Sequence, residues 1–243
     1  MSQLALDLLS GWPPTLANFV VGANVECVAA LRALAAGDRR QRFIYLWGQS
    51  GSGRSHLARA LADAVSQAQG PGSGRLIRPE DPADRFEFDE RCLLYAVDDC
   101  DRLDDTRQQA VFKLFNRVRD APGAAWIATG AQPPLGLAAR DGLRDDLRSR
   151  LGWGLVFELA PLTDAEKALA LARLAAERGV MLAADVVPYL LTHTSRDMRA
   201  LMALFDRLDR YALERKRSIT LPLLRDYLQA DLTGGFGRNP ADR

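Results

Sequence analysis

The chain has 243 residues, of which 48% are hydrophobic and 26% charged, and its formal net charge is +1. This balance is typical of a globular protein of one or two domains and excludes a collagen-like, low-complexity or disordered chain. The near-zero net charge does not indicate a nucleic acid or an anionic membrane as partner. The three cysteines are widely spaced, which excludes a disulfide framework and fits a reducing, cytoplasmic location. No apolar run approaches the ~20 residues of a membrane span.

Predicted strands and helices alternate up to about residue 160. Apolar residues recur at helical spacing in three segments: 24–36, 54–67 and 105–120. Asn24 is the predicted N-cap of the first helix. Apolar runs predict buried strands at 43–47, 76–77, 92–97, 124–129 and 155–159. We therefore expect an α/β fold with a parallel sheet covered by helices.

After Pro161 the pattern changes to helices only. Their predicted ranges are 163–178, 184–192, 196–214 and 220–230. The predicted organisation has four parts: an N-terminal tail (1–14), an αβα domain (15–161), a small all-helical domain (162–232) and a disordered tail (233–243).

A glycine-rich segment follows the first predicted strand. It reads GQSGSGRS and fits the pattern G-x-x-x-x-G-K-[ST], except that Arg54 replaces the lysine. Such a loop binds phosphate through its backbone N–H groups and the adjoining helix N-terminus, whereas a generic strand–turn–helix loop is the alternative. The predicted contacts are Gly48, Gly51, Ser52, Gly53, Arg54 and Ser55, with the backbone of His56. Arginine is longer and more planar than lysine, so we expect nucleotide binding with weak hydrolysis.

The second motif is the apolar segment Leu93–Val97, which ends in two carboxylates. In a Walker B strand Asp98 would hold Mg²⁺ together with Ser55, and Asp99 would polarise the attacking water. On its own this pattern is often just the end of a strand. Combined with the phosphate loop, it predicts a site for a nucleoside triphosphate.

These motifs resemble the DnaA-related AAA+ ATPases, and within them the Hda regulators. The resemblance implies a P-loop NTPase domain followed by a helical lid. The segment Leu16–Gly22 is similar to the stretch that lines the adenine pocket, which implies nucleotide contacts from Phe19, Val20 and Val21. The arginine in the phosphate loop is similar to the Hda pattern in particular.

Three further segments extend the resemblance over nearly the whole chain. Thr129-Gly130 resembles the end of the sensor 1 strand, which implies that Thr129 contacts nucleotide. Residues 147–151 resemble the box VII segment, which makes Arg150 the candidate arginine finger. Residues 196–199 resemble the start of the sensor 2 helix, with Arg199 facing the nucleotide. Ala131 stands where the family usually has an acid, and this argues against self-hydrolysis.

The N-terminal tail resembles the sliding-clamp-binding peptide of Hda. An extended segment of this kind offers an amide for polar anchoring and leucines for a hydrophobic groove. The predicted clamp contacts are Gln3, Leu4, Leu6 and Leu8. Asp7 departs from the pattern, because many such peptides carry proline or another uncharged residue there.

The resemblance implies an adaptor that binds ADP or ATP, with Mg²⁺ as accompanying ion. Its implied partners are the DNA-loaded sliding clamp (the DNA polymerase III beta subunit) and DnaA. Arg150 would act in trans on DnaA-bound ATP, as negative control of replication initiation, without the chain being an efficient ATPase itself.

Three alternative functions stay open: an ATP-hydrolysing helicase loader or motor, a DnaA-like initiator paralogue, and a nucleotide-free scaffold. Self-association into a homo-oligomer also stays open. Because few residues follow the helical segment, we expect no sequence-specific DNA binding.

Overall fold

The computed structural model describes residues 13–136, 143–194 and 198–232. The predicted clamp contacts therefore lie outside the described residues. The chain divides into two compact units, Met1–Pro161 and Leu162–Arg243. Among the described helices, none has both the length and the hydropathy needed to span a lipid bilayer.

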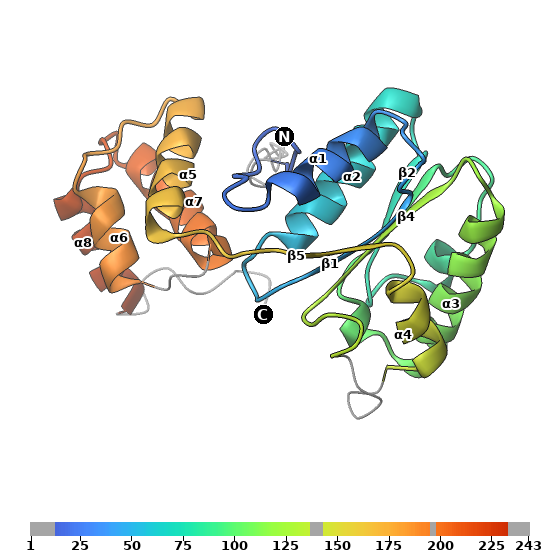
Figure 1. The fold of residues 1–243 in the computed structure, drawn as a ribbon. Coiled ribbons are helices and arrows are strands. Elements are labelled where there is room, and N and C mark those ends of the chain that lie inside the picture. Colours follow the sequence, from blue (N-terminus) through green and yellow to red (C-terminus); the bar gives the residue numbers. More distant parts are fainter. Residues whose placement is uncertain (1–12, 137–142, 195–197, 233–243) are drawn as a thin grey trace, which may run out of the picture. The chain divides into compact units, whose positions relative to one another are not determined.

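A five-stranded sheet forms the centre of the first unit (Figure 1). Its strands are β1 (Phe43–Trp47), β2 (Gly74–Ile77), β3 (Leu94–Val97), β4 (Ala125–Gly130) and β5 (Leu155–Glu158). Their spatial order is β2-β3-β4-β1-β5, and every neighbouring pair is parallel. All carboxyl ends therefore lie at one edge of the sheet, where ligands bind in open α/β folds. The predicted α/β fold class is confirmed.

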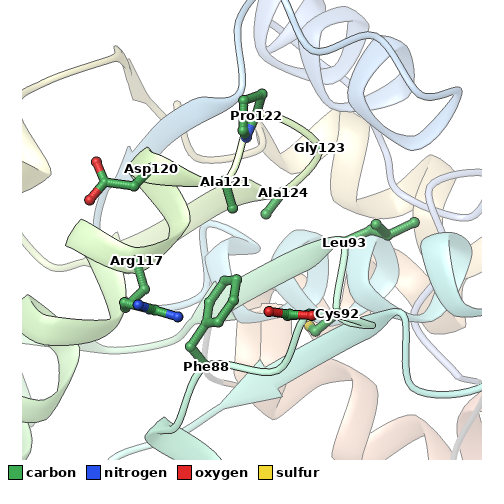
Figure 2. Close-up of a pocket in the computed structure, with 10 residues that line it drawn as sticks. Phe88, Cys92, Leu93, Arg117, Asp120, Ala121, Pro122, Gly123 and Ala124 are labelled. Carbon is green, nitrogen blue, oxygen red and sulfur yellow. The ribbon is translucent and has the colours of Figure 1, made fainter.

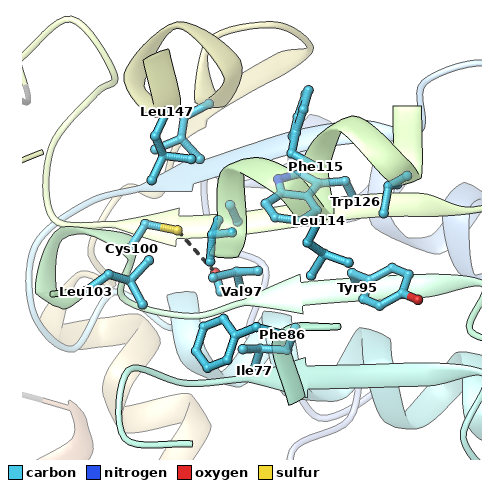
Figure 3. Close-up of a cluster of buried hydrophobic side chains, with 14 of the residues drawn as sticks. Ile77, Phe86, Tyr95, Val97, Cys100, Leu103, Leu114, Phe115, Trp126 and Leu147 are labelled. Atoms are coloured by element: carbon cyan, nitrogen blue, oxygen red, sulfur yellow. Dashed lines mark hydrogen bonds between the residues drawn. The ribbon is translucent and has the colours of Figure 1, made fainter. Parts of the chain in front are cut away.

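Helices cover both faces of the sheet: α1 (Val25–Ala35), α2 (Arg54–Gln69), α3 (Asp105–Asp120) and α4 (Asp145–Leu151). The side chains of β4 alternate between two cores, as the pleat of a strand requires. Ile127 packs in the core that contains residues of α1 and α2. Trp126 packs in the core that contains Phe115 of α3 and Leu147 of α4 (Figure 3).

Two segments of the first unit differ from the expectation. The helix α4 was not predicted, because it has only seven residues and four of them are charged. It begins with Asp145 and Asp146, whose negative charges favour a helix N-terminus. The stretch 79–90, which lies outside the predicted helices and strands, contains a short 3₁₀ helix at Ala83–Phe86 that buries Phe86.

The predicted side-chain cap at Asn24 is wrong. Asn24 does precede α1, but its side chain makes no capping hydrogen bond. Instead, Nδ2 donates to the carbonyl oxygen of Ala160 at 3.1 Å, and Oδ1 accepts from the Ala160 N–H at 2.8 Å. Two bonds to a backbone far along the chain replace the single local bond, and they tie the start of α1 to the residues after β5.

The second unit is helical, as predicted. It contains α5 (Asp164–Glu177), α6 (Val186–His193), α7 (Met198–Glu214) and α8 (Leu221–Leu232). A capping box begins α5, in which Thr163 and Glu166 each accept a hydrogen bond from the other's backbone N–H. Phe205, Leu208 and Leu224 are fully buried in a core of this unit's own.

Candidate functional site: a phosphate loop and the strand ends beside it

The glycine-rich loop connects the carboxyl end of β1 to the first residue of α2, Arg54. Gly51 and Gly53 have φ angles of +78° and +98°, which residues with a side chain rarely adopt. A Cβ atom on Gly53 would lie 2.6 Å from Cε2 of Phe19, and one on Gly48 would lie 2.8 Å from the carbonyl oxygen of Leu159. These glycines therefore let the loop turn closely against its surroundings.

Two buried polar atoms at the loop have no hydrogen-bond partner in the described part of the chain. They are Oγ of Ser52, a residue only 7% exposed, and Nη1 of Arg54. Leaving a buried polar group unpaired costs about 1–3 kcal/mol, so such groups usually face a ligand or water. Both atoms donate hydrogen bonds, and a phosphate oxygen accepts them. The residues present therefore fit a phosphate group.

The carboxylates after β3 are held by a residue of β4. The Thr129 hydroxyl donates to Oδ1 of Asp98 at 2.6 Å and accepts from the Asp99 N–H at 2.9 Å. Thr129 is fully buried, and Asp99 has a left-handed backbone with φ +50°. Thr129 thus orients both acids, a role that the sequence did not indicate.

Asp99 lies between two arginines. Its Oδ1 is 3.7 Å from Nη2 of Arg54, and its Oδ2 is 3.6 Å from Nη1 of Arg102. Burial raises the pKa of the Asp99 carboxyl above its usual value, and the neighbouring Asp98 raises it further, while Arg54 and Arg102 oppose this. Arg54, which replaces the usual lysine, is thus paired with Asp99, the acid that would polarise water.

Because its pKa is raised, ionised Asp99 destabilises the folded protein at neutral pH. Its stabilising contribution is complete below the unfolded pKa of 3.8 and is lost as the pH rises through the higher folded pKa. We expect Asp99→Asn to raise the melting temperature at about pH 7, and the difference from wild type to shrink toward about pH 4. Thermal unfolding of both proteins across this pH range measures it.

Asp38→Asn is the control of opposite sign. Hydrogen bonds from Arg40 lower the pKa of Asp38 to about 2, so its contribution is present at neutral pH and is lost only as the pH falls below 3.8. An Asp99→Asn protein that melts below wild type at neutral pH would contradict the prediction.

The segment before α1 lies against the phosphate loop. Phe19 is buried, and its ring centroid is 5.5 Å from that of His56. His56 was expected to act only through its backbone, but its Nε2 is 3.0 Å from the carbonyl oxygen of Thr15. Val20 and Val21 are half-buried in the same segment. No local pattern signals this contact, since Thr15 and His56 are far apart in sequence.

Ser55 is the second residue of α2, and it joins Asp98 in the predicted Mg²⁺ site. Within the described residues, no group of three or more His, Cys, Asp or Glu side chains is placed to hold a metal ion. The predicted site of Ser55 and Asp98 needs no such group, because one or two protein oxygens hold the Mg²⁺ of a nucleotide together with phosphate and water, and it stays a prediction.

Arg150 lies near the amino ends of the strands, whereas the phosphate loop lies at their carboxyl ends. The turn after α4 packs on the start of β1, where a Cβ on Gly154 would collide with the carbonyl oxygen of Phe43. The phosphate loop leaves the other end of β1. Because that strand has five residues at about 3.3 Å each, roughly 16 Å of strand separates the two ends.

The Arg150 guanidinium rests on aromatic rings. It lies 5.0 Å from the ring centroid of Trp153 and 5.8 Å from that of Phe112. Its Nε is buried without a hydrogen-bond partner among the residues described. By contrast, Arg144, the residue before α4, and Arg148 of α4 form ion pairs with acids.

Arg199 belongs to the second unit, where it is the second residue of α7. Its contact with nucleotide stays a prediction.

A pocket of about 390 Å³ is lined by none of the phosphate-loop residues. Figure 2 shows its lining side chains. Its lining includes Cys92 and Leu93, just before β3, and residues 121–124, just before β4. It therefore opens at the amino ends of these strands. Arg117 covers the Phe88 ring in its wall, 5.1 Å from the centroid. None of the predicted site residues lines this pocket.

Residues 164–228 match a family model described as "Hda, lid domain". The structure of domain III of DnaA from Thermotoga maritima is similar, with a TM-score of 0.72 and 19% identity, covering 92% of this chain and 96% of that one. AMPPCP-bound DnaA from Aquifex aeolicus has a TM-score of 0.64 and 23% identity, covering 86% of this chain and 69% of that one.

The RuvB Holliday junction branch migration motor of Thermotoga maritima also shares the fold. Its TM-score is 0.63 at 18% identity, and the match covers 90% of this chain and 72% of RuvB. At these identities the structural matches establish the fold, and the lid match concerns residues 164–228 alone. The predicted resemblance is confirmed at this level: the chain has the AAA+ fold of DnaA domain III, and its residues 164–228 match the model of the Hda lid domain.

Proposed function

We propose that this chain is a nucleotide-binding regulatory adaptor that stimulates hydrolysis of ATP bound to DnaA and thereby restrains replication initiation. The observation that supports it best is the placement of Arg150 in a chain with an Hda-type lid. This arginine lies near the amino ends of the strands, away from the chain's own phosphate loop. Its guanidinium packs on aromatic rings and has no acidic partner that the structure describes. An arginine placed there serves a neighbouring molecule's site, as arginine fingers do.

The chain's own site binds ADP or ATP in this proposal. Ser52 and Arg54 hold the phosphates with their unpaired donors, together with the backbone of the loop. Ser55 and Asp98 hold Mg²⁺, which would neutralise phosphate charge when bound. Two similar DnaA structures are described as bound to AMPPCP, which agrees with an adenine nucleotide here.

The N-terminal tail attaches the adaptor to the sliding clamp in this proposal. Gln3, Leu4, Leu6 and Leu8 bind the sliding clamp, so that the adaptor acts where a clamp has been loaded. Tethering raises the local concentration of Arg150 near DnaA without requiring DNA binding by this chain.

The test follows labelled ATP bound to DnaA. Purified chain and DNA-loaded clamp are added together or singly, and labelled ADP is measured over time. We expect rapid hydrolysis only with both components, and its loss when Gln3 and Leu4 are replaced by alanine. Stimulation that needs no clamp would refute the tethering, whereas turnover by this chain alone, abolished by Asp99→Asn, would favour an independent ATPase.

A second prediction concerns the ion pair between Arg54 and Asp99. Lysine has a compact charge and no planar fork, so Arg54→Lys should release Asp99 to orient water. We expect ATP hydrolysis by the isolated chain to rise about tenfold or more, since a positioned general base contributes 10²–10⁴. Phosphate release without DnaA measures this effect.

The control is the double variant Arg54→Lys, Asp99→Asn, which should return to the wild-type rate. An Arg54→Lys protein that binds ATP normally and hydrolyses it no faster would show that this ion pair does not restrain Asp99.

A further inference from the structure

We propose that His56 is a positioning residue that fixes the segment Pro13–Gly22 beside the phosphate loop, and that this contact makes the site select nucleotides over bare polyphosphate. The inference rests on the proposed binding of nucleotide. It assigns to the His56 side chain a part in recognising the nucleoside, not the phosphates.

The geometry identifies the bonding atom. His56 is the third residue of α2, and its Nε2 lies 3.0 Å from the Thr15 carbonyl oxygen. A carbonyl oxygen only accepts hydrogen bonds, so Nε2 carries the proton. The ring also contacts Phe19, the residue that closes against Gly53.

The segment that His56 contacts is a turn with its own hydrogen bonds. The Thr15 N–H donates to Oδ1 of Asn18 at 2.9 Å, and the Asn18 N–H donates to the Thr15 hydroxyl at 3.0 Å. Nδ2 of Asn18 also donates to the Pro13 carbonyl oxygen at 3.1 Å. These local bonds give the turn its shape, but they do not place it on the domain.

The turn is placed on the domain by the packing of Phe19, Leu16 and Val21 against the core, and by two hydrogen bonds to residues distant in sequence. Arg32 of α1 reaches the Leu16 carbonyl oxygen at 3.4 Å, and His56 of α2 reaches that of Thr15. The His56 bond is the shorter of the two and joins the turn to the helix whose N-terminus would hold phosphate. Because the ribose follows directly from the α-phosphate, a segment fixed at this point is within reach of the nucleoside.

The experiment compares two ligands on the full chain. Dissociation constants for ADP and for inorganic tripolyphosphate are measured by calorimetry with wild type, His56→Ala and His56→Gln. Removing one hydrogen bond should weaken ADP binding about threefold to tenfold, whereas tripolyphosphate binding should be unchanged. Glutamine can place its amide nitrogen near the position of Nε2, so it should restore most of the ADP affinity.

The second histidine of the chain is the matched control. His193 is exposed, stacks on Tyr189 and also bonds a backbone carbonyl oxygen, 3.1 Å from its Nδ1. His193→Ala should leave both affinities unchanged. An independent readout is hydrogen exchange of residues 15–22 without ligand, which should be faster in His56→Ala and normal in His56→Gln.

The outcomes are distinguishable. Equal losses of ADP and tripolyphosphate affinity would overturn the inference, because His56 would then shape the loop itself. Wild type that binds tripolyphosphate but not ADP would overturn both the inference and the proposed nucleotide binding. If His56→Ala has a lowered melting temperature, the ADP affinities of His56→Phe and His56→Gln are compared instead. Both side chains fill the space, but only glutamine keeps the hydrogen-bond donor.

Discussion

Replacing Arg150 with alanine is expected to lower the clamp-dependent hydrolysis of DnaA-bound ATP by about 10³-fold or more, because an arginine finger contributes 10³–10⁵ to the rate of phosphoryl transfer. The measurement is single-turnover hydrolysis of labelled ATP on DnaA at saturating adaptor. Arg150→Lys should recover little of the rate, since lysine lacks the planar fork that contacts two phosphate oxygens.

The matched control is Arg148→Ala. Arg148 lies on the same helix two residues earlier, but its guanidinium is paired with Asp145 at 2.9 Å, so it is not available to a partner's phosphate. We expect this variant to stimulate DnaA normally. Equal losses in both variants would mean that α4 acts through its overall charge or fold, and normal activity of Arg150→Ala would remove the finger assignment.

Folding must be checked alongside the rate. Removing the guanidinium from the rings of Trp153 and Phe112 should cost about 0.5–1 kcal/mol, a small part of a domain's stability. A melting temperature close to that of wild type would therefore accompany the loss of stimulation. The lost stimulation can then be assigned to the missing guanidinium group and not to unfolding of the domain.

Gly53→Ala is expected to weaken ADP binding by about 100-fold, which is about 2.7 kcal/mol. The φ angle of +98° disfavours a side chain by about 1–2 kcal/mol, and the new Cβ would lie 2.6 Å from the Phe19 ring. Either the loop or Phe19 must move, and each belongs to the proposed site. Calorimetric titration with ADP measures the loss.

Gly70→Ala is the control that separates the effect of backbone strain from that of the contact with Phe19. Gly70 also has a positive φ, +107°, but a Cβ there meets nothing within 4 Å, and the residue lies at the far end of α2. This variant should lose stability but keep its ADP affinity. If both variants bind ADP equally well, the close packing of Gly53 against Phe19 has no part in nucleotide binding.

Much of the first unit was predictable because parallel strands are buried on both faces. Continuous apolar runs such as 43–47 and 124–129 mark such strands directly, and glycine-rich punctuation follows the first of them. Helical periodicity identified α1, α2 and α3 for the same reason: each buries one apolar stripe. The short, highly charged α4 lacks that stripe and was missed.

The candidate site was only partly predictable. The motif placed Ser52, Arg54 and Ser55 on one loop, because neighbours in sequence stay neighbours in space. It could not show that Arg54 pairs with Asp99, or that Thr129 orients both acids. Those contacts depend on the order of the strands, in which β4 lies between β1 and β3. No spacing along the chain encodes that order.

The sequence by itself determined the α/β class, the helical second unit, the phosphate loop and the resemblance to DnaA-related proteins, since each depends on local pattern or short motifs. Only the tertiary structure decided that His56 reaches Thr15, that Asn24 bridges to Ala160, and that Arg150 lies across the sheet from the loop. The physical reason is the separation along the chain over which each kind of interaction acts. Periodicity and turn chemistry act over a few residues, whereas these contacts join segments that meet only when the strands and helices have packed.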